Sequence, residues 1–440
     1  MNNRPDFFSN TRSISAALSI LGLLLCLSCV RAQGLPSATP EQVGLSSQRL
    51  GAVSEWLRSE VAQKKIPGAV LMVVRGGKIA YVDAIGQRDP ASPAAMKVDD
   101  IFRIYSMTKP IVSVGALMLV EEGKLLLEAP VSRYIAAFGN VRVGVEKTDS
   151  QGQKSLELVA PLRPMTIQDL MRHTSGLTYG FFGEGAVKKA YRDANVGAGG
   201  DITNAEFAER IARMPLAYQP GSTWDYSNST DVLGRVIEVV SGQTLSQFLK
   251  ARLLDPLGMR DTSFYVPEAE RQIRIAEPFD SDRSIGVNAP VFEPRRALAM
   301  ESGGGGLMST AADYTRFLMM LRNGGQLDGR RYLSPATLAY MTSNQLSPAV
   351  ARTALYLPGP GYGFGLGVAV RTSAGEAASA SSVGELTWGG AGGTYWWLDP
   401  GYDMFVVFMM QSPTQRVPYR AVLRNMIYGA ITEATVQGSR

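Results

Sequence analysis

The stretch "FRIYSMTKPIVSVGALMLVEEGK", residues 102–124, places Ser106 three residues before Lys109, at the start of an apolar run with helical spacing. Because proline is tolerated in the first turn of a helix but not in its interior, Pro110 predicts that the helix begins close to Ser106. Residues three apart lie on the same side of a helix, so Lys109 is expected to reach the Ser106 hydroxyl. From these residues alone two interpretations stay open: a catalytic serine with its lysine, or a helix-capping serine beside a solvated surface lysine.

The composition is that of an ordinary globular protein, with 45% hydrophobic and 19% charged residues among 440. The length is sufficient for two or three domains with a large core. The formal charge of +5 is small for this length, and no Lys/Arg run is interleaved with aromatic residues. Nucleic-acid binding is therefore not expected.

Residues 1–32 have the pattern of a secretory signal peptide. Arg4 and Arg12 precede a short apolar stretch, and small residues precede a cut after Ala32. An N-terminal membrane anchor is the alternative, but the apolar run is shorter than the roughly 20 residues that a spanning helix needs. The sequence thus predicts export to the periplasm or the medium, with no stable membrane span once the signal is removed.

Removal of this segment also removes both cysteines, Cys26 and Cys29. A mature chain without cysteine has no disulfide, no thiolate nucleophile and no thiolate metal site. His173 is the single histidine, and zinc sites normally recruit several His or Cys ligands, so neither a metal nor another cofactor is expected. No G-x-S-x-G elbow accompanies His173, and its place before Thr174-Ser175-Gly176 predicts a structural turn rather than a member of a Ser-His-Asp triad.

The two ends of the mature chain are predicted to share one sheet. Residues 67–89 indicate two strands joined by a turn at 75–78, and three strands follow one another between 384 and 411. Helices are expected at 42–62 and 417–434. Hairpins alone cannot bury both faces, so the simplest arrangement is a mixed α/β (α+β) fold, an antiparallel sheet with helices on both faces.

A mostly helical stretch interrupts the two ends, with its clearer helices at 166–173, 203–213, 230–240 and 244–253. The predicted organisation is an α/β domain of residues 33–125 and 291–440 with a helical insertion domain of residues 126–290. A substrate cleft is expected where the two parts meet.

Two further motifs favour the catalytic interpretation of Ser106. Tyr226-Ser227-Asn228 is the one Y-x-N triplet in the chain, and Trp388-Gly389-Gly390 stands at a strand whose glycines leave the backbone approachable. The order S-x-x-K, Y-x-N and a glycine-containing strand resembles the serine β-lactamase and penicillin-binding-protein superfamily. The chain is most similar there to class C β-lactamases and the related family VIII carboxylesterases. The resemblance covers nearly the whole mature chain and includes "LMRHTSGLTYG" at 170–180.

The resemblance implies a role for each matching residue. Ser106 would be the acylated nucleophile, with Lys109 and Tyr226 as its base system. The backbone N–H groups of Ser106 and Ala391 would form the oxyanion hole, and Asn228 would position the substrate carbonyl and Lys109. Unperturbed tyrosine and lysine have pKa values near 10 to 10.4, so each needs the other or burial to act near neutral pH, and which one holds the proton at rest stays open.

The third motif departs from the β-lactamase pattern. Those enzymes usually carry K-T-G or H-T-G where this chain has Trp388, Gly389 and Gly390, and the last lysine is Lys250. An indole and two glycines suit an uncharged acyl or alkyl group better than a carboxylate. The leading hypothesis is an exported serine hydrolase that cleaves small esters of short to medium acyl chains through an acyl-enzyme.

Three alternatives remain: a β-lactamase or D-Ala-D-Ala carboxypeptidase-like enzyme, an acyltransferase or amide hydrolase, and a catalytically silent envelope binding protein. Residues 303–306, four glycines in succession, lack the Lys-Ser/Thr of a phosphate loop. They are expected to form a flexible connection.

Overall fold

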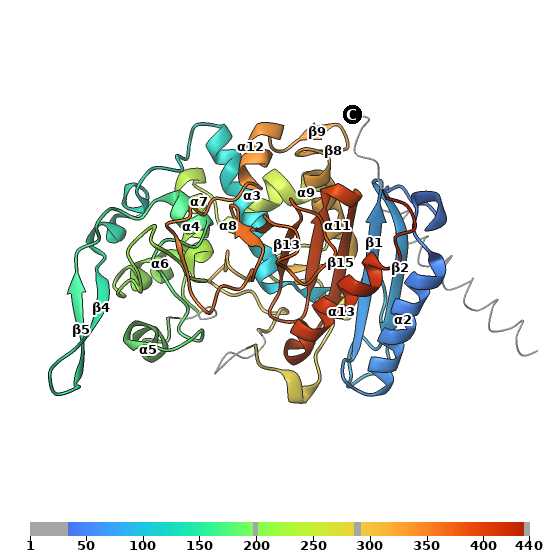
Figure 1. The fold of residues 1–440 in the computed structure, drawn as a ribbon, viewed down its shortest axis with the longest axis horizontal. Coiled ribbons are helices and arrows are strands. Elements are labelled where there is room, and N and C mark those ends of the chain that lie inside the picture. Colours follow the sequence, from blue (N-terminus) through green and yellow to red (C-terminus); the bar gives the residue numbers. More distant parts are fainter. Residues whose placement is uncertain (1–33, 197–200, 286–291, 435–440) are drawn as a thin grey trace, which may run out of the picture.

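A computed structural model describes residues 34–196, 201–285 and 292–434 (Figure 1). Its centre is a seven-stranded antiparallel sheet in the order β11-β12-β13-β14-β15-β1-β2. The strands are β1 (Gly68–Arg75), β2 (Lys78–Gly86), β11 (Tyr362–Phe364), β12 (Ala369–Arg371), β13 (Leu386–Gly389), β14 (Tyr395–Asp399) and β15 (Met404–Met410). Because β1 pairs with β15 from Ala69↔Met410 to Arg75↔Met404, the prediction that the two ends of the chain share one sheet is confirmed.

Both faces of this sheet are covered, which explains why β1 is buried along its whole length and apolar up to Val74 rather than alternating. Leu71 belongs to a core cluster with Leu57 of α2 (Ser47–Ala62) and Leu423 of α13 (Arg416–Tyr428). Its neighbour Met72 points the other way, into the main core with Phe317 of α11 (Ala311–Arg322). The predicted mixed fold with helices on both faces is therefore confirmed (Figure 1).

Two predicted helix bounds are wrong. The C-terminal helix ends at Tyr428, since the chain then turns so that Ile431 forms a β-bridge with Leu45. The N-terminal helix begins at Ser47 and not at residue 42, because Gly44 adopts a left-handed conformation (φ 69°) and Ser46 caps the new helix by accepting from the Arg49 N–H.

The helical stretch between the sheet strands carries the predicted helices, with small shifts of their ends. It also contains a two-stranded hairpin, β4 (Val143–Thr148) with β5 (Lys154–Val159), that the sequence analysis missed and that projects from the molecule (Figure 1). The helices of this stretch are α4 (Ile167–Met171), α5 (Ala186–Asp193), α6 (Asn204–Ala212), α7 (Ser229–Ser241), α8 (Leu245–Leu249), α9 (Asp255–Leu257) and α10 (Ala269–Gln272). The domain limits remain predictions; the second, 290/291, and the signal peptide, 1–32, lie outside the described residues.

The remaining elements are α3 (Thr108–Glu121), α12 (Pro335–Met341) and the short strands β3 (Phe102–Arg103), β6 (Thr223–Trp224), β7 (Met308–Ser309), β8 (Gln326–Leu327), β9 (Arg330–Arg331) and β10 (Ala351–Arg352). β3 pairs with β7, so the chain just before Ser106 lies beside the chain just after the glycine run. None of the helices in the described ranges combines the length and apolar character needed to cross a bilayer.

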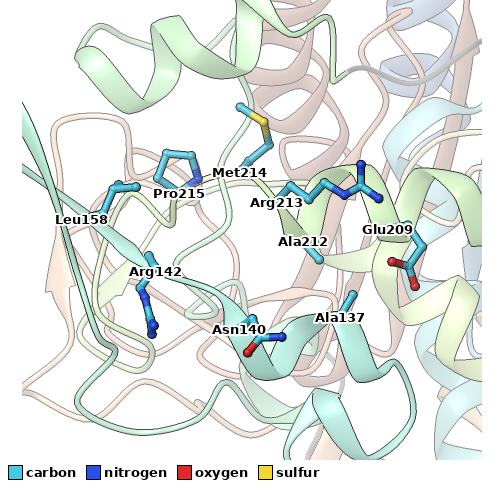
Figure 2. Close-up of a pocket in the computed structure, with 9 residues that line it drawn as sticks. All are labelled: Ala137, Asn140, Arg142, Leu158, Glu209, Ala212, Arg213, Met214 and Pro215. Carbon is cyan, nitrogen blue, oxygen red and sulfur yellow. The ribbon is translucent and has the colours of Figure 1, made fainter.

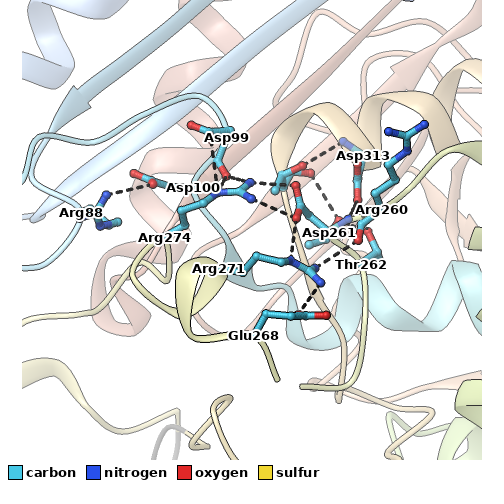
Figure 3. A network of polar contacts seen from close by, with 12 residues as sticks. Arg88, Asp99, Asp100, Arg260, Asp261, Thr262, Glu268, Arg271, Arg274 and Asp313 are labelled. Carbon is cyan, nitrogen blue, oxygen red and sulfur yellow. Dashed lines mark hydrogen bonds and ion pairs between the residues drawn. The ribbon is translucent and has the colours of Figure 1, made fainter. Parts of the chain in front are cut away.

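A polar network fastens the segment around α10 to the chain that leads into β3 (Figure 3). Arg274 donates from Nε to the Asp99 carbonyl at 2.9 Å and forms an ion pair of 2.8 Å with Asp261. Arg271 pairs with the same Asp261 carboxylate at 3.1 Å. The backbone adds a bond from the Ile101 N–H to the Arg274 carbonyl. Arg274 therefore holds the chain that leads to Ser106 through both its side chain and its main-chain carbonyl.

Candidate active site

Ser106 sits in a tight helical turn, Tyr105–Met107, between β3 and α3. Tyr105 has φ 45°, a left-handed conformation that is uncommon for a residue with a side chain. Ser106 is half-buried and does not cap α3, whose N-cap is Met107 without a side-chain bond. The predicted helix start is confirmed to within two residues, and the interpretation of Ser106 as a helix cap is wrong.

Lys109 is fully buried, so the interpretation of this residue as a solvated surface charge is also wrong. Its ammonium donates to Ser106 Oγ at 3.3 Å, to the Gly304 carbonyl at 2.6 Å and to Tyr179 OH at 3.4 Å. Among the described residues no carboxylate forms an ion pair with it. A buried cation without a paired anion is costly, and such an arrangement is typical of a functional group rather than of a structural one.

Tyr226 presents the face of its ring to this ammonium. Lys109 Nζ lies 4.5 Å from the Tyr226 ring centroid, a cation–π geometry. The Tyr226 hydroxyl accepts a hydrogen bond of 3.3 Å from Trp388 Nε1 of β13. The structure therefore brings together the predicted residues Ser106, Lys109, Tyr226 and Trp388, although within the described chain no hydrogen bond joins the Tyr226 hydroxyl to Lys109.

Tyr179 is a second tyrosine at the ammonium, and the sequence analysis missed its role. It comes from the loop after α4 and its pKa is raised well above the usual value by burial and, to a smaller extent, by the negative charge of Asp231. The neutral hydroxyl is thus its resting form. The stretch 170–180 contributed to the family resemblance, but the separation of 70 residues from Lys109 gave no signal that the two meet.

The glycines after Trp388 let the next turn pack against the chain that carries Ser106. A Cβ on Gly390 would lie 2.5 Å from the Ile104 carbonyl oxygen, and the Gly390 N–H donates to the Thr394 carbonyl at 2.8 Å. Ala391 is half-buried, and its N–H finds no acceptor within the described residues. A free amide beside the nucleophile turn fits the predicted oxyanion-hole role of Ala391.

Asn228 is placed differently from expectation. It is fully buried, and its Nδ2 donates to the Thr178 carbonyl at 2.8 Å, while no bond to Lys109 appears among the described residues. Its Oδ1 has no hydrogen-bond partner in the same part of the chain. Asn228 thus holds the loop that carries Tyr179, and the expected contact with Lys109 is not present.

Arg420 of α13 is a cation that the sequence analysis did not connect with the Trp-Gly-Gly strand. A Cβ on Gly389 would lie 2.3 Å from its Nη2, and this nitrogen donates to the Gly390 carbonyl at 3.2 Å. The glycine at 389 is what lets the guanidinium lie against β13. Trp388 points to the other face of the sheet, since it packs in the main core.

His173 forms the expected structural turn. It has φ 57° just after α4, and its Nδ1 lies 3.2 Å from Ser227 Oγ. Burial first, and then the nearby charge of Lys109, lowers its pKa well below 6.5, so the imidazole stays neutral. The ring packs against Tyr226 with 4.9 Å between the centroids, so His173 supports the Tyr226 side chain.

The glycine run at 303–306 is not a flexible connection. A Cβ on Gly303 would meet the Thr230 carbonyl oxygen at 2.5 Å, and one on Gly304 would meet the Asp231 carboxylate at 2.4 Å. Only glycine lets this loop pack so closely on α7. The loop is a rigid platform that presents the Gly304 carbonyl to Lys109.

Two further features of the described residues concern ligand binding: the grouping of metal-ligating side chains and a pocket away from Ser106. Within the described ranges no group of three or more His, Cys, Asp or Glu side chains is arranged to hold a metal ion. A pocket of about 490 Å³ lies between the β4–β5 hairpin and α6, away from Ser106 (Figure 2). Its lining is Ala137, Asn140, Arg142, Leu158, Glu209, Ala212, Arg213, Met214 and Pro215.

Comparisons with known proteins agree with this geometry. A family model described as Beta-lactamase matches residues 53–427. Protein Rv1367c of Mycobacterium tuberculosis is 37% identical over 354 residues, 79% of this chain and 86% of Rv1367c. Esterase EstB of Burkholderia gladioli is 32% identical over 415 residues, 89% of this chain and 98% of EstB. The solved structure of EstCE1, described as a hydrolase with promiscuous acyltransferase activity, superposes with a TM-score of 0.73 at 28% identity, covering 87% of this chain and 99% of EstCE1.

Proposed function

The chain belongs to the beta-lactamase family, and we propose that within it the protein is a serine carboxylesterase that cleaves small uncharged esters through an acyl-enzyme on Ser106. The observation that carries the proposal is the nitrogen of the buried Lys109 side chain, 3.3 Å from the half-buried Ser106 hydroxyl. A serine hydroxyl is a weak nucleophile until a neighbouring base removes its proton. A lysine taken out of water beside two tyrosines provides such a base system.

The proposed reaction has two steps, acylation of Ser106 and hydrolysis of the acyl-enzyme. Ser106 Oγ attacks the ester carbonyl carbon, its proton passes to the Lys109/Tyr226 system, and the N–H groups of Ser106 and Ala391 stabilise the oxyanion. The bond to the alcohol oxygen then breaks, and the alcohol leaves with the proton. In the second step the Lys109/Tyr226 system takes a proton from water as the water oxygen adds to the acyl carbon. The bond to Ser106 Oγ then breaks, the base system returns the proton to Oγ, and the carboxylic acid leaves.

The surroundings of Trp388 favour an uncharged substrate. Its indole packs with Tyr226 (5.4 Å between centroids) and Phe364 (5.3 Å), and the half-buried Phe181 and Phe182 extend the aromatic wall beyond Tyr226. A carboxylate desolvated against these rings finds no compensating cation from β13. Arg420 lies on the opposite side of that strand.

Hydrolysis of p-nitrophenyl esters of increasing acyl length, beside nitrocefin on one preparation, tests this function. The kcat/KM for p-nitrophenyl butyrate should exceed that for nitrocefin by at least ~100-fold, about 2.7 kcal/mol in transition-state binding. Comparable values, or nitrocefin as the better substrate, would replace the esterase proposal by a β-lactamase one in which some arginine outside β13 anchors the substrate carboxylate. Arg420→Met tests the arginine that packs against Gly389: a selective loss of nitrocefin turnover would identify it as that anchor.

Acyl transfer to an alcohol is the second candidate, because EstCE1 is described as a hydrolase with promiscuous acyltransferase activity. Hydrolysis and transfer share the acyl-enzyme and differ only in whether water or an alcohol attacks it. Adding methanol or butanol to the ester assay and quantifying the new ester separates transfer from hydrolysis. Export is likewise proposed from residues 1–32. Cell fractionation with N-terminal sequencing of the mature protein checks it.

A further inference from the structure

Asp231 is a buried acidic residue in the first turn of α7 for which the proposed reaction has no role. Only 2% of it is exposed. One carboxylate oxygen accepts from Ser302 Oγ at 2.5 Å and from the Gly304 N–H at 3.0 Å. The carbonyl of Gly304 is in turn the closest acceptor of the Lys109 ammonium, at 2.6 Å.

This chain of contacts joins a buried anion to a buried cation through one residue. The close approach is enforced by the sequence, since a Cβ on Gly304 would meet the Asp231 carboxylate at 2.4 Å. Lys109 has no ion pair among the described residues, yet its positive charge acts on Asp231 and lowers a pKa that burial raises. The two buried groups are therefore linked by geometry through the Gly304 peptide and by the attraction that Asp231 feels from Lys109.

We propose that Asp231 is the positioning residue for Lys109: its carboxylate fixes the Gly304 peptide that receives the ammonium and supplies the negative charge that balances this cation in the interior. The inference rests on the proposed function for its kinetic consequences and on geometry alone for its consequences for stability. An acidic residue in a first helical turn also stabilises the helix through the macrodipole. The experiment has to separate these two roles.

A double-mutant cycle of melting temperatures separates the two roles of Asp231 and needs no activity assay. Lys109→Met leaves the Asp231 carboxylate without its counter-charge, and Asp231→Asn leaves the ammonium without its own. Asparagine has the shape of aspartate and keeps an oxygen that can accept from the Gly304 N–H, so this substitution mainly removes charge. The double variant should therefore melt roughly 3 to 6 °C higher than the sum of the two single effects predicts.

The matched control is Glu301→Gln. Glu301 precedes Ser302 but turns outward to α8, where it accepts from the Ser246 N–H at 2.6 Å. Combined with Lys109→Met, it should give additive changes in melting temperature. Additive changes for Asp231→Asn as well would overturn the proposal and leave Asp231 as a helix-terminal residue. If Asp231→Asn does not fold alone, the double variant should fold, and a double variant that also fails to fold overturns the proposal.

The kcat of Asp231→Asn and its pH dependence should change if Asp231 positions Lys109, and should not change if Asp231 only stabilises the helix. The groups that face Lys109 are Tyr179, Tyr226, His173 and Asp231, besides the Ser106 hydroxyl. Loss of the Asp231 charge removes a negative charge from the interior, which favours deprotonation of the reacting groups there, so the alkaline limb of the kcat profile should move to lower pH. The kcat of Asp231→Asn should fall at least tenfold with KM changed less than threefold, about 1.4 kcal/mol in the chemical step.

The two proposals can fail separately. Energetic coupling between Lys109 and Asp231 in a protein that turns over no ester would sink the esterase function and support the role of Asp231. Ester turnover by the wild type, together with an Asp231→Asn variant that keeps the wild-type kcat and alkaline limb, would sink the role of Asp231 alone. The assays are melting curves of the purified chains and pH–rate profiles with p-nitrophenyl butyrate.

Discussion

Two buried polar clusters lie on opposite faces of β13–β15, and they are satisfied to different degrees. In the Arg424 cluster (Glu385, Tyr395 and Arg424), the guanidinium binds the carboxylate through two bonds of 2.6 Å and donates to the tyrosine hydroxyl at 2.8 Å. In the Lys109 cluster (Ser106, Lys109, Tyr179, Tyr226 and Gly304), the ammonium has one short bond, to a carbonyl, and two of 3.3 and 3.4 Å.

Under the proposed function, this difference separates a structural network from a reactive one. A bidentate Arg–carboxylate pair has its charge balanced and its geometry fixed, so it has no proton to exchange. The Lys109 ammonium contacts groups that can gain or lose a proton, and the Asp231 carboxylate is linked to it through the Gly304 peptide. Substitutions in the two clusters should therefore affect different quantities, catalysis in one and stability in the other.

Ser106→Ala should have the largest effect on catalysis. Ester turnover should be abolished, because the variant lacks the serine hydroxyl that Lys109 Nζ contacts, whereas the fold loses no helix cap. The free energy of unfolding should change by less than about 1 kcal/mol. The measurement is p-nitrophenyl ester turnover beside urea unfolding, and retained turnover by the folded variant would move the nucleophile elsewhere.

Lys109→Ala and Tyr226→Phe should each reduce kcat by roughly 10³-fold or more, and the double variant should be little worse than either, since groups that act as a unit are not additive. Tyr179→Phe should be compared beside them, because Tyr179 also contacts the ammonium. A larger loss for Tyr179→Phe than for Tyr226→Phe would exchange the roles of the two tyrosines.

Arg424→Met tests whether the Arg424 cluster contributes to stability rather than to catalysis. It leaves the fully buried Glu385 carboxylate unpaired, and the free energy of unfolding should fall by about 3–5 kcal/mol. Because Arg424 lies across the sheet from Ser106, kcat per folded molecule should stay within about threefold. Urea unfolding and turnover normalised by phosphonate titration measure the two quantities, and a selective loss of kcat would erase the distinction between the clusters.

His173→Asn should have the smallest effect on chemistry. Asparagine tolerates the left-handed backbone of this position, and a neutral imidazole contributes no limb to the pH–rate profile. Because the folded pKa lies below the unfolded value near 6.5, the wild type loses stability as the pH falls below 6.5 while the variant does not. The difference in free energy of unfolding should change by roughly 1 kcal/mol between pH 6.5 and 5.5. A limb of the kcat profile that disappears with the imidazole would reinstate a histidine mechanism.

The sequence predicted the parts of this molecule that depend on local pattern. The continuous apolar runs of β1 and β15, the turn before Lys78 and the S-x-x-K spacing each carry their information within a few residues. The short strands β11 and β12 were missed, because three residues each do not establish a period.

Contacts between distant segments could not be predicted in this way. Tyr179, Asp231 and Gly304 meet Lys109 or its peptide support from three separate parts of the chain. The glycine run in particular looked flexible, since sequence alone does not show which backbone or carboxylate occupies the space where a Cβ would be. Close packing, rather than local propensity, decides those positions.

The most direct measurement of the central claim is the intact mass of the protein after incubation with a p-nitrophenyl alkylphosphonate, followed by peptide mapping. One phosphonyl group should appear per chain, on the peptide that contains Ser106, and it should form much more slowly in Lys109→Ala. No adduct on a folded chain, or an adduct on another serine, would contradict the assignment of Ser106 as the nucleophile of this site.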